Sequence, residues 1–211
     1  MALYLWFTFF LAYLAATLSP GPNVLLVVRN ALRHGPNAMG ATLLGNLTAQ
    51  LLVTSGVALG VGALLIAMPT AFLALKIIGA GYLIYLGLRQ LFARQAAAGK
   101  ASVEPSAAVV VAGWRIAGEA FLVSASNPKT MIFLCAFLPQ FLQAERSLVL
   151  QFTVMYVTIA AIVVVVHSLY CFAAFRFSKR LSAQRWVATI KRLTGALFIG
   201  LGVRLLSVRA T

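Results

Sequence analysis

The sequence AGEAFLVSASNPKTMIFLCAFLPQF, residues 117–141, is long and apolar enough to cross a lipid bilayer, but its centre is polar. Pro128 removes a backbone N–H donor and clashes with the preceding turn, so we expect the helix to kink or break there. Lys129 follows and places an ammonium group at membrane depth, at a cost of at least ~2.5 kcal/mol. A broken helix with a charge survives in lipid only where it faces protein or a water-filled cavity. The stretch therefore predicts a polar site inside a membrane protein.

A second interruption, SPGPN at residues 19–23, lies in the first apolar segment of the chain. Two broken helices in corresponding positions are the best sequence indication of a transporter's binding site. At such breaks, free amides suit a carboxylate and free carbonyls suit an ammonium group, so we expect a site for a small zwitterion. The alternative is that the prolines only kink the helices for packing. The candidate binding residues at the two breaks are Pro20, Gly21, Pro22, Asn23, Asn127, Pro128 and Lys129.

The composition is that of an integral membrane protein. Of the 211 residues, 62% are hydrophobic and 9% are charged, with a mean hydropathy of +0.97, whereas a soluble domain carries about 25% charged residues. The formal net charge is +14, but the lysines and arginines lie between apolar segments, which is the positive-inside pattern of membrane proteins. A nucleic-acid-binding protein would gather them on a solvated face. We therefore expect a lipid bilayer, and no nucleic acid, as a partner of this chain.

Six apolar segments indicate an all-α, multi-pass membrane protein with six transmembrane helices, the first and fourth of them broken. Lysine and arginine concentrate in the first, third and fifth loops, which predicts that these loops are cytoplasmic and that both termini lie outside. The N-terminus lacks the positive region of a signal peptide, so we expect it to be retained as part of the first span. The six segments cover approximately residues 2–28, 39–68, 72–92, 109–142, 148–175 and 193–208.

The two halves of the chain are similar to each other. A shift of 115 residues pairs residues 86–87 with residues 201–202, and a shift of 108 pairs Pro20 with Pro128. Two halves of three spans each must cross the membrane in opposite directions, which is the inverted repeat that alternating access uses. Glycines in the third and sixth segments predict close helix crossings, and they would permit a homodimer without requiring one. We expect one transporter domain, residues 1–211, with halves at about 1–92 and 109–208 and a linker at about 93–108.

The interruptions belong to a longer series of motifs. SPGPN is followed by GYLIYLG (81–87), NPK (127–129), FLPQF (137–141) and GALFIGLGVRL (195–205). In order and spacing, over essentially the whole chain, these motifs resemble the LysE/RhtB family of amino-acid exporters. The resemblance implies a bacterial cytoplasmic-membrane protein that exports amino acids or close derivatives, driven by the proton gradient. Members handle basic, aliphatic and hydroxylated amino acids, so the resemblance does not select the substrate; by motif match it supports site roles for Pro20, Gly21, Pro22, Asn127, Pro128 and Lys129.

Two charged residues in the fourth segment have more than one interpretation. Lys129 is either a counter-charge for the substrate carboxylate, a group that loses its proton during the cycle, or a donor that binds the carbonyls freed by the break. Glu119 is a candidate for the coupling proton. However, Arg115 lies four residues earlier, the spacing of a same-face helix pair, so we favour a structural Arg115–Glu119 pair.

Polar side chains in two other segments are further candidates. His167 lies in the apolar fifth segment, where it either relays protons or makes a hydrogen bond to a neighbouring helix. In the second segment, Asn46, Gln50 and Thr54 share one helix face, which we expect to point inward. That face either lines the transport path, with Asn46 and Gln50 as binding residues, or bonds helix to helix.

The leading hypothesis is an amino-acid exporter that works by alternating access and proton antiport. The second is an exporter of another small solute or a metal cation, but His, Cys and carboxylates do not cluster at membrane depth, so we expect no metal site. The third is an intramembrane enzyme or thiol-redox protein. It would need a nucleophile beside a base, which Ser124 and Ser126 lack, or a CxxC pair, which Cys135 and Cys171 do not form. No P-loop is present in the sequence, and we expect neither enzymatic activity nor a cofactor.

Overall fold

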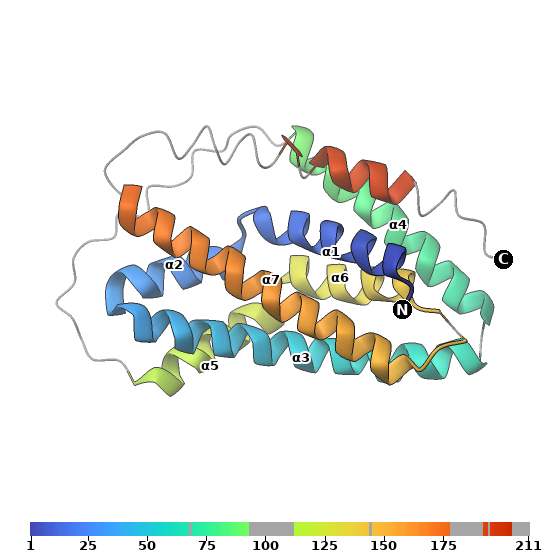
Figure 1. Cartoon of the computed structure of the whole chain (residues 1–211), viewed down its shortest axis with the longest axis horizontal. Coiled ribbons are helices and arrows are strands. Elements are labelled where there is room, and N and C mark those ends of the chain that lie inside the picture. Colours follow the sequence, from blue (N-terminus) through green and yellow to red (C-terminus); the bar gives the residue numbers. More distant parts are fainter. Residues whose placement is uncertain (68, 93–111, 144, 178–191, 194, 204–211) are drawn as a thin grey trace.

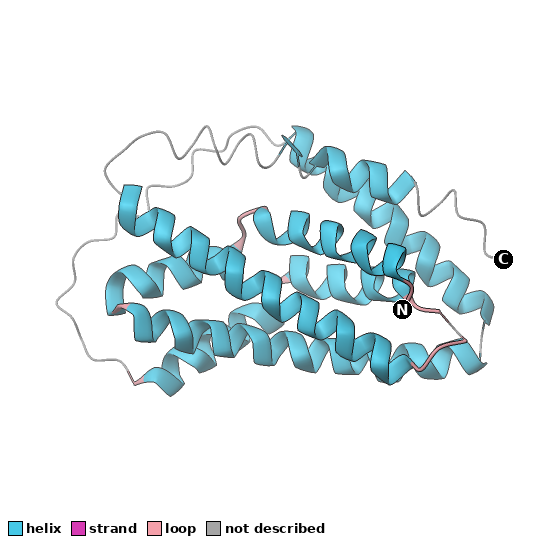
Figure 2. Cartoon of the chain, in the orientation of Figure 1, coloured by secondary structure: helices cyan, strands magenta, loops and turns pink. Residues whose placement is uncertain are grey.

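The computed structural model describes residues 1–67, 69–92, 112–143, 145–177, 192–193 and 195–203 of the chain. These residues form helices and short connections with no strand among them, which confirms the expected all-α class (Figure 2). The expected linker at about 93–108 lies outside the described residues.

The first expected break is present. The first apolar segment forms α1 (Leu3–Leu18) and α2 (Pro22–His34), which are bent by 58° relative to each other. Pro20 and Pro22 have no backbone N–H, so they interrupt the hydrogen bonds between the two helices, and Pro22 then begins α2, where no donor is needed. Gly35 turns the chain into the next helix with a φ of +83°, which glycine adopts without strain.

The second expected break is also present. The fourth apolar segment forms α5 (Gly113–Ala125) and α6 (Pro128–Phe137), which are bent by 60°. Pro128 is the first residue of α6, as Pro22 is of α2. By its position in the half-helix, Pro128 matches Pro22, whereas Pro20, with which the 108-residue shift pairs it, lies between α1 and α2. The inverted repeat on which that pairing depends stays a prediction.

The half-helices form two groups on either side of the breaks. In Figure 1, α2 and α5 lie toward one end of the molecule, whereas α1 and α6 lie toward the other. α2 contacts α5, and α5 has its most extensive contact with α3. α3 and α7 run alongside both groups, so the breaks lie in the middle of the bundle. The elements beside the half-helices are α3 (Pro36–Ala67), α4 (Pro69–Phe92), the 3-10 helix η1 (Leu138–Phe141), α7 (Leu148–Phe177) and the helical residues 195–203.

The helices fit a multi-pass membrane protein. Two stretches of the described chain, Pro36–Gly60 and Leu148–Arg176, are long and apolar enough to cross a membrane. Each bent pair adds one more if it counts as a single span, which gives up to four. α4 and residues 195–203 are not among these stretches, so the six-span arrangement stays a prediction.

Buried aromatic side chains fill the space between α1 and α6. Phe9 stacks on Phe137 with 5.9 Å between ring centroids, and Tyr13 meets Phe133 edge-on at 5.7 Å. Phe141 of η1 packs against Phe9 at 5.4 Å. Such pairs add to the free energy gained by burying the rings. These five side chains, the aromatic cluster, close the α1–α6 side of the breaks.

α4 and the helix at residues 195–203 cross closely, as the glycines predict. A Cβ atom on Gly87 would lie 2.6 Å from the carbonyl oxygen of Gly195, and a Cβ atom on Gly202 would lie 2.9 Å from that of Ala80. The 115-residue shift seen in the sequence pairs Gly87 with Gly202 and Ala80 with Gly195. The contact of Gly87 with Gly195 and the contact of Gly202 with Ala80 are therefore related by the same shift.

Candidate functional site

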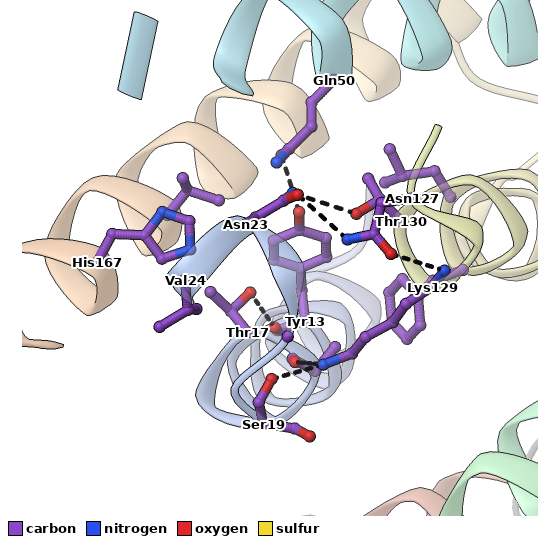
Figure 3. A pocket seen from close by; sticks show the side chains of 15 residues that line it. Tyr13, Thr17, Ser19, Asn23, Val24, Gln50, Asn127, Lys129, Thr130 and His167 are labelled. Carbon is purple, nitrogen blue, oxygen red and sulfur yellow. Dashed lines mark hydrogen bonds between the residues drawn. The ribbon is translucent and has the colours of Figure 1, made fainter. Parts of the chain in front are cut away.

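A polar cavity lies where the two breaks meet, bordered by α1, α2, α3, α6 and α7 (Figure 3). Its volume is about 50 Å³, which accommodates a few water molecules, since one needs roughly 10–15 Å³. The polar side chains that line it are those of Tyr13, Thr17, Ser19, Asn23, Gln50, Asn127, Lys129, Thr130 and His167.

The cavity brings together most of the residues that the sequence nominates. The nominated residues that line it are Gly21, Asn23, Gln50, Asn127, Lys129 and His167. Those that form the breaks without lining the cavity are Pro20, Pro22 and Pro128. Those that lie off the cavity are Asn46 and Glu119.

The ammonium group of Lys129 binds the open end of α1. Its Nζ atom donates hydrogen bonds to the carbonyl oxygens of Ala16, at 2.8 Å, and of Ser19, at 2.6 Å. The Tyr170 hydroxyl donates to a third carbonyl at this end, that of Leu18, at 2.7 Å. The last carbonyls of a helix lack partners within it and carry partial negative charge. Lys129 thus makes the carbonyl contact that is one of its three expected roles.

The start of α2 makes the corresponding contact with α5. Asn23, the second residue of α2, donates from Nδ2 to the Ser124 hydroxyl in the last turn of α5, at 3.2 Å. Lys129 is likewise the second residue of α6 and reaches the last turn of α1. Asn127 joins the two, since it donates to Asn23 Oδ1 at 3.2 Å and accepts from the Lys129 N–H at 3.1 Å. The neutral amide of Asn23 makes one of these cross-links, and the ammonium group of Lys129 makes the other, which Figure 3 shows.

The amide end of α2 faces the cavity without a side-chain cap. Its N-cap residue is Gly21, whereas the side chain of Asn127 caps α6. Gly21, Asn23 and Val24 all line the cavity. His167 of α7 lines it as well; this residue is 3% exposed, and its Nδ1 atom has no hydrogen-bond partner. Because a helix start favours an anion, the cavity has a positive end at α2 and a negative end at α1.

The polar face of α3 points inward, as expected. Gln50 accepts a hydrogen bond from the Tyr13 hydroxyl at 2.9 Å, so it both lines the cavity and joins α3 to α1. Asn46 is fully buried but lies off the cavity, and neither its amide nitrogen nor its amide oxygen has a partner. The Thr54 hydroxyl is also buried without a partner. Among Asn46, Gln50 and Thr54 on this face of α3, Gln50 is the residue that lines the cavity.

Glu119 pairs with a different arginine from the one that helix spacing predicts. Its Oε1 atom lies 2.5 Å from Nη2 of Arg29 on α2, in the only salt bridge between residues that the structure describes. The guanidinium of Arg115 instead lies 5.3 Å from the centroid of the Trp114 ring. The expected Arg115–Glu119 pair is therefore wrong. Four-residue spacing considers one helix, whereas the packing of α2 against α5 brings a cation from 90 residues away into reach.

Sequence reasoning does not identify several residues that line the cavity. Tyr13 and Thr17 lie one turn apart on the face of α1 that leads to the break. Thr130 follows the NPK motif directly, and Phe133 lies about one turn later. Polar side chains at helical spacing on either side of each break are the signal that would have found the first three.

Comparison with known proteins identifies the family. A family model described as "LysE type translocator" matches residues 14–209. The chain belongs to this family. The resemblance seen in its motifs is thereby confirmed.

Curated relatives of this LysE-family chain include named efflux proteins. It is 29% identical over 204 residues to the homoserine/homoserine lactone efflux protein of Salmonella typhi, with 97% of each chain covered. It is 26% identical over 216 residues to the leucine efflux protein of Salmonella choleraesuis, covering 97% of this chain and 96% of the relative. An uncharacterized membrane protein of Pseudomonas aeruginosa is 32% identical over 209 residues, with 95% and 94% covered. No solved structure matches the chain significantly.

Proposed function

We propose that this protein exports amino acids or close derivatives across the bacterial cytoplasmic membrane by alternating access, with protons moving in the opposite direction. The family and the efflux proteins among the relatives support export. The observation that carries the substrate class is the cavity, where the carbonyl end of one half-helix and the amide end of the next face the same space. An α-amino acid presents the two complementary charges, an ammonium group for the carbonyls and a carboxylate for the amides.

Each of the two helix ends at the first break binds one charged group of the zwitterionic substrate. The carbonyl oxygens of Ala16 and Ser19 bind the substrate ammonium, since they already accept bonds from an ammonium group. The amides at the start of α2 bind the carboxylate, with Asn23 and His167 beside them. Gln50 supplies a further polar contact from α3.

The charge of the cavity favours neutral amino acids. No Asp or Glu side chain is found among the described residues that line it, whereas Lys129 is a cation. A basic side chain would therefore find no counter-charge and an unfavourable neighbour. We assign aliphatic and hydroxylated amino acids as substrates, a class that includes the homoserine and leucine of the relatives' names.

The cavity must widen before it can hold an amino acid, because about 50 Å³ is less than the ~150 Å³ that holds a benzene molecule. The salt bridge between Arg29 and Glu119 closes the α2–α5 side. Gly45 of α3 adds to this closure, since its Cα packs directly on the carbonyl of Ala117 in α5. The aromatic cluster closes the α1–α6 side. Alternating access opens one side at a time.

We further propose six spans in an inverted repeat, with both termini outside. Two helix pairs bent by 58° and 60° support two similar halves, as does the exchange of Gly87 and Gly202 by the 115-residue shift. Arg33 in the last turn of α2 and Arg115 at the start of α5 lie on the same side of the breaks. By the positive-inside rule, the α2–α5 side faces the cytoplasm.

His167 is our candidate for the coupling proton. It is buried in α7 and lines the cavity with an unpartnered ring nitrogen, so a proton gained there would act directly on the charges of the substrate. Glu119 lies off the cavity in a salt bridge, and we assign it to closure of the α2–α5 side.

Counterflow in proteoliposomes tests the function. Vesicles loaded with unlabelled leucine or homoserine should accumulate the labelled amino acid from outside, whereas vesicles loaded with lysine or glutamate, and protein-free vesicles, should not. In vesicles that contain no amino acid, an acidic lumen should accelerate net uptake, because protons leave as the amino acid enters. Folded protein that gives no counterflow with any amino acid would overturn the proposal. Net uptake that does not respond to the pH step would overturn proton coupling alone.

A further inference from the structure

The ammonium group of Lys129 occupies the position that the proposed function assigns to the ammonium group of the substrate. We propose that Lys129 is an internal substitute for that group: it fills the carbonyl site at the end of α1 in the empty transporter, and the arriving amino acid displaces it. This inference rests on the proposed function and extends it to the return of the empty transporter.

The carbonyl site takes one cation at a time. Nζ of Lys129 lies 2.8 Å from the oxygen of Ala16 and 2.6 Å from that of Ser19, so both oxygens are in direct contact with it. A second ammonium group on the same oxygens would touch the first, and like charges repel strongly at contact in a medium of low dielectric constant. Substrate binding therefore requires Lys129 to leave these oxygens.

The cavity offers Lys129 a second position. Its side chain runs along the backbone of Gly21, where a Cβ atom would lie 3.8 Å from Cδ and 4.0 Å from Nζ. Gly21 is the N-cap residue of α2, the end that binds the carboxylate in the proposed function. A short rotation of the lysine side chain thus carries Nζ from the carbonyl end toward the substrate carboxylate. The carbonyl contact and the counter-charge role become two successive states of one residue.

The cross-link between Asn23 and Ser124 shows that a side chain can join two half-helices from this position without a charge. Asn23 is the second residue of α2 as Lys129 is of α6, and each reaches the last turn of the opposite half-helix. The amide of Asn23 makes its cross-link to Ser124 while neutral. A charge buried in a membrane protein is expensive, so its presence on one side only indicates a task that needs a cation.

The need for a cation at the carbonyl site differs between two modes of transport, exchange and net export. In exchange, the transporter crosses in both directions with an amino acid bound, so a substrate ammonium always fills the carbonyl site. In net export, the transporter returns with the coupling proton but without an amino acid. The carbonyls of Ala16 and Ser19 would then be buried without a partner unless Lys129 binds them. Net export therefore needs Lys129 more than exchange does, because exchange loses only the contact of Lys129 with the substrate carboxylate.

Lys129→Met tests this separation in proteoliposomes with labelled leucine and homoserine. Net efflux into amino-acid-free buffer should fall by about tenfold or more, since unpaired buried carbonyls carry a penalty of that order. Exchange against the same unlabelled amino acid should fall at least about tenfold less than net efflux, because it loses only the contact with the substrate carboxylate. Tyr170→Phe is the matched control, because it removes a neutral donor from the Leu18 carbonyl at the same helix end; it should slow both modes equally. Loss of exchange in step with net efflux in Lys129→Met would overturn the inference.

A second measurement does not depend on the transported substrate. Methylammonium should refill the vacated site in Lys129→Ala and raise the melting temperature of the purified protein by about 2–4 °C, with no such rise in wild type. Tetramethylammonium, which has no N–H donor, should have no effect on either protein. If wild type carries neither leucine nor homoserine but methylammonium stabilises Lys129→Ala, the proposed function fails and the carbonyl site stands. If Lys129→Ala does not fold, Lys129→Met takes its place, and no response to methylammonium in a folded variant would refute the site.

Discussion

Arg29 of α2 and Glu119 of α5 form a salt bridge that joins the two half-helices on one side of the breaks. Their side chains are 43% and 44% exposed, so water screens the pair and its contribution to stability is about 0–1 kcal/mol. A weak salt bridge suits a gate, because the proposed alternating access requires the pair to separate in every transport cycle.

Removing either partner should alter transport more than folding. Glu119→Gln and Arg29→Gln should each change the rate of leucine efflux by about two- to fivefold, with unchanged abundance in the membrane. The exchanged pair, Arg29→Glu with Glu119→Arg, should recover most of the wild-type rate. Arg115→Gln is the control, and we expect it to behave as wild type. If Arg115→Gln reproduces the effect of Glu119→Gln, the intrahelical pair is the functional one and the gate assignment fails.

The packing of α3 on α5 leaves no room for a side chain at Gly45. A Cβ atom there would overlap the carbonyl oxygen of Ala117, which belongs to the helix backbone and cannot turn away. Gly45→Ala should therefore destabilise the protein by at least about 1–3 kcal/mol and lower its abundance. Gly56→Ala, in the same helix, is the control, because nothing lies within 4 Å of its Cβ position; it should be neutral or stabilising by up to ~1 kcal/mol. Thermal melting of the detergent-purified proteins measures both, and equal stability of the two variants would contradict the close contact.

The breaks could be predicted from the sequence because their cause is local. Proline lacks a donor wherever it lies, so the ends of α1 and α5 follow from Pro20, Pro22 and Pro128 without any knowledge of the fold. The same holds for Lys129, since a charge in an apolar segment must find polar neighbours. Chemistry along the chain therefore located the centre of the candidate site.

The hydrogen-bond and ion-pair partners around the breaks could not be predicted from the sequence, because they come from distant helices. The carbonyl of Leu18 is bonded by Tyr170 from 152 residues away, and Glu119 is paired across 90 residues. Neither contact leaves a spacing signal in the sequence. Asn46 illustrates the converse: its inward direction follows from helix periodicity, but its distance from the cavity does not.

The crossing of α4 with the last described helix tests the repeat. Gly87→Ala and Gly202→Ala place a Cβ atom in equivalent close contacts, at 2.6 Å and 2.9 Å from backbone oxygens. We expect both to destabilise the protein to a similar extent, about 1–3 kcal/mol. Gly81→Ala and Gly200→Ala provide one control in each helix, because nothing lies within 4 Å of either Cβ position. The melting temperatures of the four variants measure these effects. A large loss of stability in only one of Gly87→Ala and Gly202→Ala would argue against equivalent halves.

His167 provides the test of coupling. His167→Gln retains a neutral hydrogen-bonding side chain but removes the titrating ring. Exchange of labelled leucine should therefore persist, while the acceleration of net leucine uptake by an acidic lumen disappears. His34→Gln is the control, since His34 is exposed in the last turn of α2 and lies off the cavity. Uptake measured with and without the pH step separates coupling from the transport rate itself. Coupling that survives in His167→Gln would assign the proton to another group; Lys129 and Tyr13 are then the remaining titratable side chains among the described residues that line the cavity.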